Sequence, residues 1–347
     1  GVARIWPTFD QAADPGAPLA SGQPLALSHG SWVWCAVFNI EGTRVATSGN
    51  GTDAKIWEFP SGRLLQAIEH KDTVRSVSFS PDGKYVVTAS LDKIGRVSET
   101  DTGAKVVDLV GHTNGLIGAA FSPDGRSVFT VADDVRIWDW RTGQPACPPI
   151  RLENGVSAVS LSAQGDRLVL GTTKGEVSVW EFPAGRRLFE LPRHQRMIAT
   201  AEFSVDGCRL LTAEYDYFGG IARVWDGHDG KPLSPELEHR RALTDAHFSP
   251  DGLYLATASQ DGLVRVWDAL TYETWCEPID TGQFSFSLAF APDGHRIATS
   301  SGKGIAAVWD LRPGKAMPIE LSEAPGPLSS CLFQSDARVV AASRDGT

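Results

Sequence analysis

The sequence predicts an all-β fold built from eight copies of one unit of four short strands. The first observation behind this prediction is a repeat, in which a hydrophobic landmark residue recurs at intervals of 41, 42, 40, 42, 45, 42 and 43 residues. The second is that turn sequences divide each interval into strand-length segments. The third is the composition, with 35 Gly, 21 Pro and 11 Trp among 347 residues. A fixed period is the signature of repeat architectures, and frequent turns with many tryptophans favour strands over helices. The landmark residues are Phe38, Phe79, Phe121, Leu161, Phe203, Phe248, Phe290 and Phe333.

The clearest copy, "FSPDGLYLATASQDGLVRVWD" at residues 248–268, indicates the order of the strands in one unit. A first strand ends at the landmark phenylalanine, and "PDG" supplies a turn whose glycine can adopt a positive φ. The next segment alternates or runs apolar as a half-buried strand does, "DG" makes a second tight turn, and a third strand ends in tryptophan. A short loop such as "RTGQ" or "PSGR" then leads into a brief fourth segment such as "LLQAI". No long segment with helical periodicity remains, so we expect four strands in each unit.

This order of residues resembles the WD-repeat β-propeller family, and the resemblance covers essentially the whole chain. It rests on a His, then a Ser or Thr on the second strand, an Asp in the following turn, and a Trp on the third strand. In that family these four side chains hydrogen-bond in series and tie each blade together, because a buried His or Asp is tolerated only with partners. The phrases "TGQPACPPIRL" and "HDGKPLSPELEH" look like those of bacterial WD-repeat proteins, in which propellers often accompany kinase or NTPase modules.

The resemblance implies a complete hydrogen-bond network in three copies. The second copy has Ser98 where Trp belongs, and the first has no clear turn Asp. The fourth and seventh copies lack both the His and the Asp. We expect these two blades to be the looser ones, since each lost hydrogen bond is worth about 1 kcal/mol net. The complete sets are His112, Thr130, Asp134 and Trp138; His194, Thr212, Asp216 and Trp225; and His239, Thr257, Asp261 and Trp267.

The two ends of the chain read as parts of one blade. Placing "SRDGT", at residues 343–347, in front of "GVARIW", at residues 1–6, rebuilds the second turn and third strand of a unit. The C-terminus would supply the two inner strands, from about residue 328 to 343, and the N-terminus the two outer ones, around residues 3–6 and 24–27. A shared blade closes the ring and leaves no unpaired sheet edge.

We therefore predict one closed propeller domain over residues 1–347, most simply with eight blades and with residues 8–23 as a long outer loop. A seven-bladed ring, or part of a longer tandem array, is the alternative. The absence of an initiator Met suggests a domain excised from a larger protein.

Charge and cysteine content exclude several classes of partner and site. The net charge of −10 disfavours nucleic acid and anionic membranes as partners, since phosphate binding needs clustered Lys and Arg. The five cysteines are scattered without a CxxC pair, so we expect neither a disulfide framework nor a zinc cluster. A reducing, cytoplasmic location fits best. No stretch approaches 18 consecutive apolar residues, so we expect no membrane span.

An enzyme site in the central channel would need convergent carboxylates or histidines near the start of the inner strands. The residues four positions before the landmarks include none that is acidic: Trp34, Arg75, Ile117, Ser157, Ala199, Thr244, Phe286 and Ser329. Asp245 is expected to stand alone as a solvated or locally bonded side chain. Five of the eight histidines occupy the repeat position, whereas His228, His247 and His295 are scattered. We predict no catalysis, no cofactor and no metal, with a propeller-type enzyme as one alternative and a purely structural ring as another.

The resemblance implies a docking surface for a protein or peptide of unknown identity on the upper face of the ring. In that family the residues four and six before the landmark, and the one before the turn Asp, line this face. Aromatics at these positions concentrate on the first and seventh blades, which flank the shared blade. The alternative is that some of these rings fill gaps between blades as core. A second candidate is the inserted turn "EYDYFGG" at residues 214–220. Flanking domains of the same polypeptide are possible partners, and the ring is expected to be monomeric. The predicted docking residues are Trp32, Trp34, Arg75, Ile117, Met197, Tyr215, Tyr217, Phe284, Phe286 and Arg344.

Overall fold

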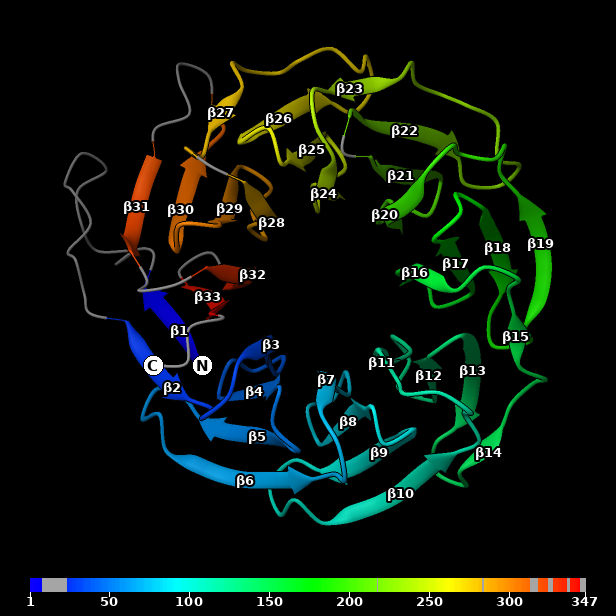
Figure 1. Ribbon diagram of the computed structural model, residues 1–347, viewed down its shortest axis with the longest axis vertical. Helices are drawn as coiled ribbons and strands as arrows, with labels where there is room; N and C mark the ends of the chain where they lie inside the picture. The colour runs from blue at the N-terminus through cyan, green and yellow to red at the C-terminus, as the bar shows by residue number, and fades with distance from the viewer. Residues whose placement is uncertain are drawn as a thin grey trace.

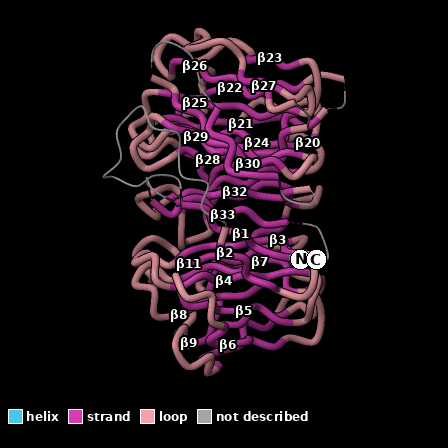
Figure 2. Tube along the Cα trace, turned by 90° about the vertical axis from the view of Figure 1, so that its left-hand side faces the viewer, coloured by secondary structure: helices cyan, strands magenta, loops and turns pink. Residues whose placement is uncertain are grey.

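The computed structural model shows eight antiparallel sheets arranged as blades around a central channel (Figure 1). It describes residues 1–7, 24–216, 218–282, 284–312, 318–323, 327–335 and 338–343. Seen from the side, the blades form a disc whose strands run between its two faces (Figure 2). The prediction of an eight-bladed ring is confirmed, and the seven-bladed alternative is excluded.

Blades 1 to 4 follow one another along the chain, each from its innermost strand outwards. Blade 1 holds β3 (Val33–Phe38), β4 (Arg44–Gly49), β5 (Asp53–Glu58) and β6 (Leu64–Glu69). Blade 2 holds β7 (Val74–Phe79), β8 (Tyr85–Ser90), β9 (Ile94–Glu99) and β10 (Lys105–Val110). Blade 3 holds β11 (Gly118–Phe121), β12 (Ser127–Val131) and β13 (Asp134–Asp139), with an outer strand in two pieces, β14 (Gln144–Pro145) and β15 (Ile150–Arg151). Blade 4 holds β16 (Val156–Leu161), β17 (Arg167–Thr172), β18 (Val177–Glu181) and β19 (Arg186–Glu190).

Blades 5 to 8 complete the ring. Blade 5 holds β20 (Met197–Phe203), β21 (Arg209–Tyr215), β22 (Gly220–Asp226) and β23 (Leu237–His239). Blade 6 holds β24 (Leu243–Phe248), β25 (Tyr254–Ser259), β26 (Leu263–Asp268) and β27 (Ile279–Asp280). Blade 7 holds β28 (Ser285–Phe290), β29 (Arg296–Ser301), β30 (Ile305–Asp310) and β31 (Pro318–Glu323). Blade 8 holds β32 (Leu328–Ser335) and β33 (Arg338–Ser343), followed outwards by β1 (Val2–Pro7) and β2 (Leu25–Ser28).

Blade 8 joins the two ends of the chain as predicted. β1 pairs with β33 in an antiparallel register that runs from Ala3 opposite Ala342 to Pro7 opposite Arg338. The side chain of Trp6 is only 1% exposed and packs in a cluster with Val339. Backbone pairing and a buried indole therefore close the ring together. Residues 8–23, which were predicted to form an outer loop, lie outside the described residues.

The hydrophobic core lies between neighbouring blades rather than within any one of them. One cluster, for example, joins Leu211 of blade 5 to Phe248 and Leu255 of blade 6. Second strands such as β25 are buried on both faces, which explains why their sequences run apolar instead of alternating. Apolar contact on both sides of each sheet holds the blades in a fixed order around the channel.

The hairpin between the first two strands of a blade uses a recurring serine turn. In blade 6, the Ser249 hydroxyl donates to Asp251 Oδ1 at 2.6 Å and accepts the backbone N–H of Tyr254 at 2.9 Å. Gly252 has a φ of 72°, which a glycine adopts without strain. The same serine–aspartate contact occurs at Ser80, Ser122 and Ser204.

The blade network implied by the resemblance is present in blades 3 and 6. In blade 6, His239 Nε2 lies 2.7 Å from Thr257 Oγ1, and His239 Nδ1 lies 3.4 Å from Asp261 Oδ2. The indole N–H of Trp267 donates to the same threonine oxygen at 3.1 Å. Burial lowers the pKa of His239, with Asp261 opposing this shift in part. The corresponding residues of blade 3, with contacts of 2.6 to 2.8 Å, are His112, Thr130, Asp134 and Trp138.

The structure corrects one member of the predicted blade 5 network. The carboxylate that meets His194 Nδ1, at 2.6 Å, belongs to Glu214 and not to Asp216. Asp216 instead accepts a hydrogen bond from Arg196 Nε at 2.9 Å. The physical reason is reach: Glu214 lies on β21 two residues nearer to the threonine, and its longer side chain extends to the imidazole. The contacts of Thr212 with His194 and with Trp225 are as predicted, at 3.1 and 2.8 Å.

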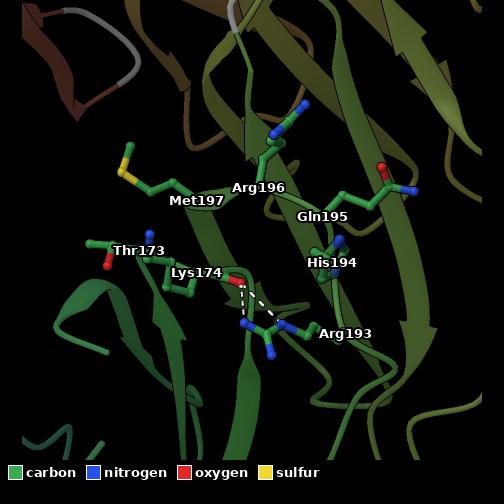
Figure 3. A pocket seen from close by; sticks show the side chains of 7 residues that line it. All are labelled: Thr173, Lys174, Arg193, His194, Gln195, Arg196 and Met197. Carbon is green, nitrogen blue, oxygen red and sulfur yellow. Dashed lines mark hydrogen bonds between the residues drawn. The ribbon is translucent and has the colours of Figure 1, made fainter. Parts of the chain in front are cut away.

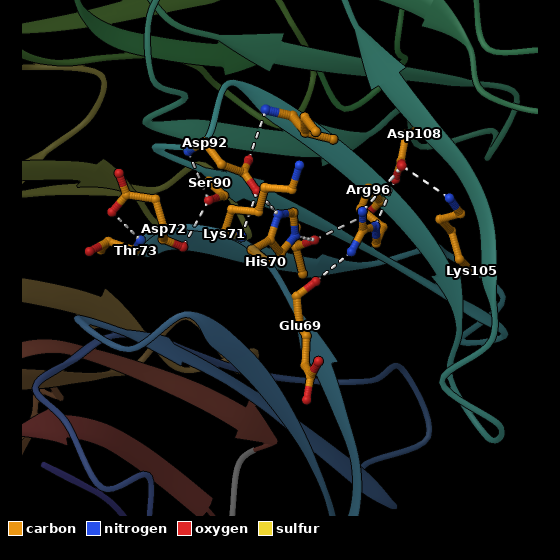
Figure 4. A network of polar contacts seen from close by, with 12 residues as sticks. Glu69, His70, Lys71, Asp72, Thr73, Ser90, Asp92, Arg96, Lys105 and Asp108 are labelled. Atoms are coloured by element: carbon orange, nitrogen blue, oxygen red, sulfur yellow. Dashed lines mark hydrogen bonds and ion pairs between the residues drawn. The ribbon is translucent and has the colours of Figure 1, made fainter.

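Blade 2 keeps the His, Thr and Asp of the network but has Ser98 at the tryptophan position. Figure 4 shows His70 beside Asp92. His70 lies 3.0 Å from Asp92 and 2.7 Å from Thr88. The Ser98 hydroxyl, at the tryptophan position, is buried without a hydrogen-bond partner among the described residues. Blade 2 therefore carries a polar group whose desolvation is not compensated.

Blades 4 and 7 lack the His–Asp contact, as the sequence indicated. In blade 4, Asn154 donates to the Glu176 carboxylate at 3.0 Å, and the Trp180 indole donates to Ser178 at 2.8 Å. In blade 7, the Trp309 indole still donates to Thr299 Oγ1 at 2.9 Å. Substitute contacts thus replace part of the network, and the greater looseness of these blades stays a prediction.

Candidate docking face

The upper face of the ring is the face at which the innermost strand of each blade begins. Because neighbouring strands of a blade run antiparallel, the starts of the first and third strands and the ends of the second and fourth meet there. All of the predicted docking residues that the structure describes belong to these segments. Tyr217 and Arg344 lie outside the described residues.

A β-bulge recurs at the start of the innermost strands and determines which side chains reach the upper face. The pairing of β3 with β4 shifts register between Val33 and Cys35, so Trp34 is the extra residue. Arg75 and Phe286 hold the corresponding positions in β7 and β28. An extra residue re-aims its side chain away from the regular alternation of the strand. The bulge therefore gives a physical basis for the position four before the landmark in these blades, whereas the pairing of β11 with β12 in blade 3 has no register shift.

Trp32, Trp34 and Arg75 form a contiguous cluster across blades 1 and 2, which we call the tryptophan cluster. The two indole rings are 6.5 Å apart in an edge-to-face arrangement. The Arg75 guanidinium lies over the Trp34 ring, 4.6 Å from its centroid. The Trp34 indole N–H donates to Asn50 Oδ1 at 2.6 Å, which fixes the ring. Trp32 is 47% exposed, so its ring is not core.

Blade 7 presents a second aromatic position. Phe284 is 46% exposed, whereas Phe286 is half-buried. Blade 8 lies between these rings and the tryptophan cluster (Figure 1). The alternative that some of the four rings are core is therefore excluded for Trp32 and Phe284, whereas it stays open for the half-buried Trp34 and Phe286.

The remaining predicted residues are spread around the ring. Ile117 is exposed on blade 3, and Met197 lies opposite Tyr215 in the pairing of β20 with β21. The Tyr215 hydroxyl accepts a hydrogen bond from Gln260 of blade 6 at 2.8 Å, so Tyr215 links two blades. In the inserted turn, Phe218 is 91% exposed.

A hollow of about 530 Å³ on this face lies between blades 4 and 5 and is basic (Figure 3). Arg193 donates to the Lys174 carbonyl at 3.3 Å and lies 3.5 Å from the Glu176 carboxylate. Arg196 pairs with Asp216. No ion pair of the Lys174 ammonium occurs among the described residues. The repeat pattern does not reveal this hollow, because the cations that line it come from loops outside the repeat positions. The lining residues are Thr173, Lys174, Arg193, His194, Gln195, Arg196 and Met197.

A carboxylate–imidazole–carboxylate cluster borders the channel where blades 5 and 6 meet. His247 Nδ1 lies 2.8 Å from Glu202, and its Nε2 lies 2.9 Å from Asp245. Asp245 also accepts the backbone N–H of Leu288 in blade 7 at 3.1 Å. Burial alone would lower the pKa of His247, but the charges of Asp245 and Glu202 raise it well above its ordinary value. Asp245 was expected to stand alone and His247 to be unrelated to it, and the structure corrects both expectations.

The described residues contain no group of three or more His, Cys, Asp or Glu side chains that could hold a metal ion. In the described part of the chain, no helix is long and apolar enough to cross a membrane.

Comparison with protein families and known proteins places these features in context. The family model "WD domain, G-beta repeat" matches residues 22–58, 62–97, 103–139, 230–268 and 280–310, together more than half of the chain. A chicken protein named "Serine-threonine kinase receptor-associated protein" is 32% identical over 147 residues, which cover 42% of this chain and 41% of that protein. The protein of the same name from Dictyostelium discoideum is 29% identical over 158 residues, 44% of this chain and 53% of its own length.

These matches thus span about half or less of the relatives' own lengths. The relatives are eukaryotic and do not support the resemblance to bacterial proteins. Among solved structures, the computationally designed Ika8 protein superposes with a TM-score of 0.80 over 92% of this chain and 96% of its own, at 24% identity. At that identity the likeness concerns the fold alone.

Proposed function

This chain belongs to the WD40-repeat family, and we propose that it is a non-catalytic scaffold that docks a protein or peptide segment on its upper face. The observation that carries this proposal is the tryptophan cluster. Two indoles and a guanidinium lie together with one ring about half exposed, and Trp and Arg are the residue types that most often anchor interfaces. Exposed aromatic rings reduce solubility unless a partner covers them.

The channel geometry supports a scaffold rather than an enzyme. Both nitrogens of His247 lie within hydrogen-bond distance of carboxylates, at 2.8 and 2.9 Å, and its raised pKa keeps it protonated. A protonated imidazole with both N–H groups engaged cannot accept a proton as a general base. The alternative of a purely structural ring leaves the exposure of Trp32 and Phe284 without a reason.

Two further parts of the proposal concern location and partners. Five free thiols favour a reducing compartment, and we place the protein in the cytoplasm. The name of the chicken relative describes association with a serine-threonine kinase receptor, which agrees with a binding role. The partner of this chain is a protein, either a separate one or a flanking part of the same polypeptide.

The test compares capture of a partner by the immobilised domain and by variants of equal stability. Trp32→Ala and Phe284→Ala remove exposed rings from the upper face, and Leu270→Ala removes an exposed apolar side chain near the end of β26, on the opposite face. We expect a partner that is retained by the parent and by the Leu270 variant to be lost from the upper-face variants. Retention by all three variants, with unchanged melting temperatures, would refute docking at these residues.

A further inference from the structure

Blade 7 has an empty position where most other blades hold a histidine ring. In blades 1, 2, 3, 5 and 6 a histidine stands 18 residues before the network threonine, and a ring nitrogen lies between 2.7 and 3.1 Å from the threonine hydroxyl. The residue 18 positions before Thr299 is Thr281. Its short side chain cannot fill the space of an imidazole.

The partners of the missing ring are still in place. Thr299 accepts the indole N–H of Trp309 at 2.9 Å, as the network threonines of blades 1, 3, 5 and 6 do from theirs. The Thr281 hydroxyl donates to the Gly262 carbonyl of blade 6 at 2.9 Å, toward the neighbouring blade. A hollow of about 250 Å³ remains, lined mainly by Thr281, Thr299, Ser301, Ile305, Ala307 and Trp309.

This hollow opens toward the upper face. Asp280 and Gly282 line it and also line an adjoining hollow of about 240 Å³ that reaches Phe284. Apart from its chain neighbours, a Cβ placed on Gly282 would meet no atom within 4 Å, so the space beside this residue is open. The two hollows therefore adjoin at Asp280 and Gly282, between the exposed Phe284 ring and the interior of the blade.

We propose that this blade 7 pocket binds the imidazole ring of a histidine side chain from a docked protein segment. The inference rests on the proposed docking function, and it names the partner side chain that would enter the propeller at blade 7. The reason is that the same chain supplies the same site five times and fills it each time with an imidazole. Inside the pocket the Thr299 hydroxyl donates to one ring nitrogen, and the Trp309 face covers the ring.

The second ring nitrogen needs an acceptor at the mouth of the pocket. In blades 2 and 6 this role belongs to the aspartate four residues after the threonine, whereas Lys303 stands there in blade 7. Asp280 lines both hollows and offers a carboxylate oxygen instead. An N–H on the outer nitrogen can therefore be met by a charged acceptor, which strengthens the hydrogen bond. A phenyl ring would fill the same space, but it has no nitrogen to accept from the Thr299 hydroxyl and no N–H to donate to Asp280.

The test uses imidazole and the tripeptide Gly-His-Gly as probes and the tryptophan indole N–H resonances as readout. We expect a saturable shift of the Trp309 resonance, because its N–H donates to the threonine that would bind the probe. The Trp267 resonance is the internal control, since His239 already occupies the matching site of blade 6. Toluene, which has the ring without the nitrogens, should give no saturable shift. Equal shifts at Trp267 and Trp309, or none at either, would overturn the proposal.

Two substitutions test the pocket itself. Thr281→His supplies the missing ring from the chain and should weaken imidazole binding at least tenfold, while Thr281→Ser keeps the pocket and should bind as the parent does. Ala307→Leu narrows the hollow without adding a polar group and should also abolish the shift. Binding that persists in both filled variants would refute the site. These titrations need no partner, so their failure is distinguishable from failure of the upper-face capture experiment.

Discussion

His247 of blade 6 lies with Nδ1 2.8 Å from the Glu202 carboxylate of blade 5, so an ion pair joins two blades at the channel wall. The same carboxylate accepts the backbone N–H of Phe248 at 2.7 Å, and Asp245 does this for Leu288 in blade 7. The innermost strand is the edge of its sheet and has backbone groups without strand partners. Carboxylates that accept those N–H groups bring negative charge together, and the protonated imidazole between them compensates it.

His247→Gln should destabilise the fold and change how stability depends on pH. The folded chain holds the His247 proton more tightly than the unfolded chain, where the ordinary pKa of 6.5 applies. The contribution of this group is therefore complete below about pH 6.5 and is lost as pH rises through the raised pKa. We expect a loss of about 1 to 2 kcal/mol at pH 7, below the value for a fully buried pair because the His247 side chain is 34% exposed.

Urea denaturation of the parent and the His247→Gln variant between pH 6 and 10 measures this effect. Other groups titrate equally in both proteins, so the difference between the two curves isolates His247. The destabilisation should shrink as pH rises. A difference that stays constant over this range would show that His247 is not protonated in the fold.

Acidification should destabilise the protein through the blade histidines. Burial lowers the pKa values of His29, His70, His112 and His239, that of His29 to about 4. The unfolded chain takes up these protons near pH 6.5 while the folded chain does not, so stability is lost as pH falls from about 6.5 towards 4. For His29 alone the loss at pH 5 is on the order of 2 kcal/mol. Urea midpoints at pH 7.5 and 5 measure it, and His29→Gln should show a smaller drop than the parent; an equal drop would contradict the assignment.

Local chemistry explains why the sequence was sufficient to predict the blades but not the channel cluster. The number of blades and the sharing of blade 8 follow from turn sequences and a fixed spacing, which act within one unit. The contacts of Glu202 and Asp245 depend on the bulge at Thr244, because one extra residue reverses which side chains face the next blade. The replacement of Asp216 by Glu214 likewise depends on which of the two side chains reaches His194 in three dimensions. Both features arise from geometry between segments, and spacing alone does not encode it.

Trp6 and Trp32 should differ greatly in their contribution to stability, because Trp6 lies in the blade that closes the ring and Trp32 lies on the upper face. Trp6 is buried in blade 8, so Trp6→Ala should lower the free energy of unfolding by about 3 to 5 kcal/mol. Trp32 is about half exposed on the upper face, so Trp32→Ala should cost far less. Thermal melts of the two variants give the comparison. Similar melting temperatures would mean either that the β1–β33 junction contributes little or that Trp32 is packed more tightly than its exposure indicates.

Two serines of blade 2, Ser90 and Ser98, are equally buried but differ in their hydrogen bonds. The Ser98 hydroxyl has no hydrogen-bond partner among the described residues, whereas Ser90 Oγ donates to the Asp72 carbonyl at 3.0 Å and accepts the Asp92 N–H at 3.1 Å. An uncompensated buried hydroxyl costs free energy, and its removal by Ser98→Ala should raise the stability by about 1 kcal/mol. Ser90→Ala removes a group of the same size but leaves Asp72 and Asp92 with unpaired backbone groups, so it should lower the stability by a similar amount or more. Urea denaturation of both variants at pH 7 measures the pair, and the opposite signs make the result independent of the small cavity that each substitution creates. A loss of stability in Ser98→Ala equal to that in Ser90→Ala would show that the Ser98 hydroxyl does have a partner in solution.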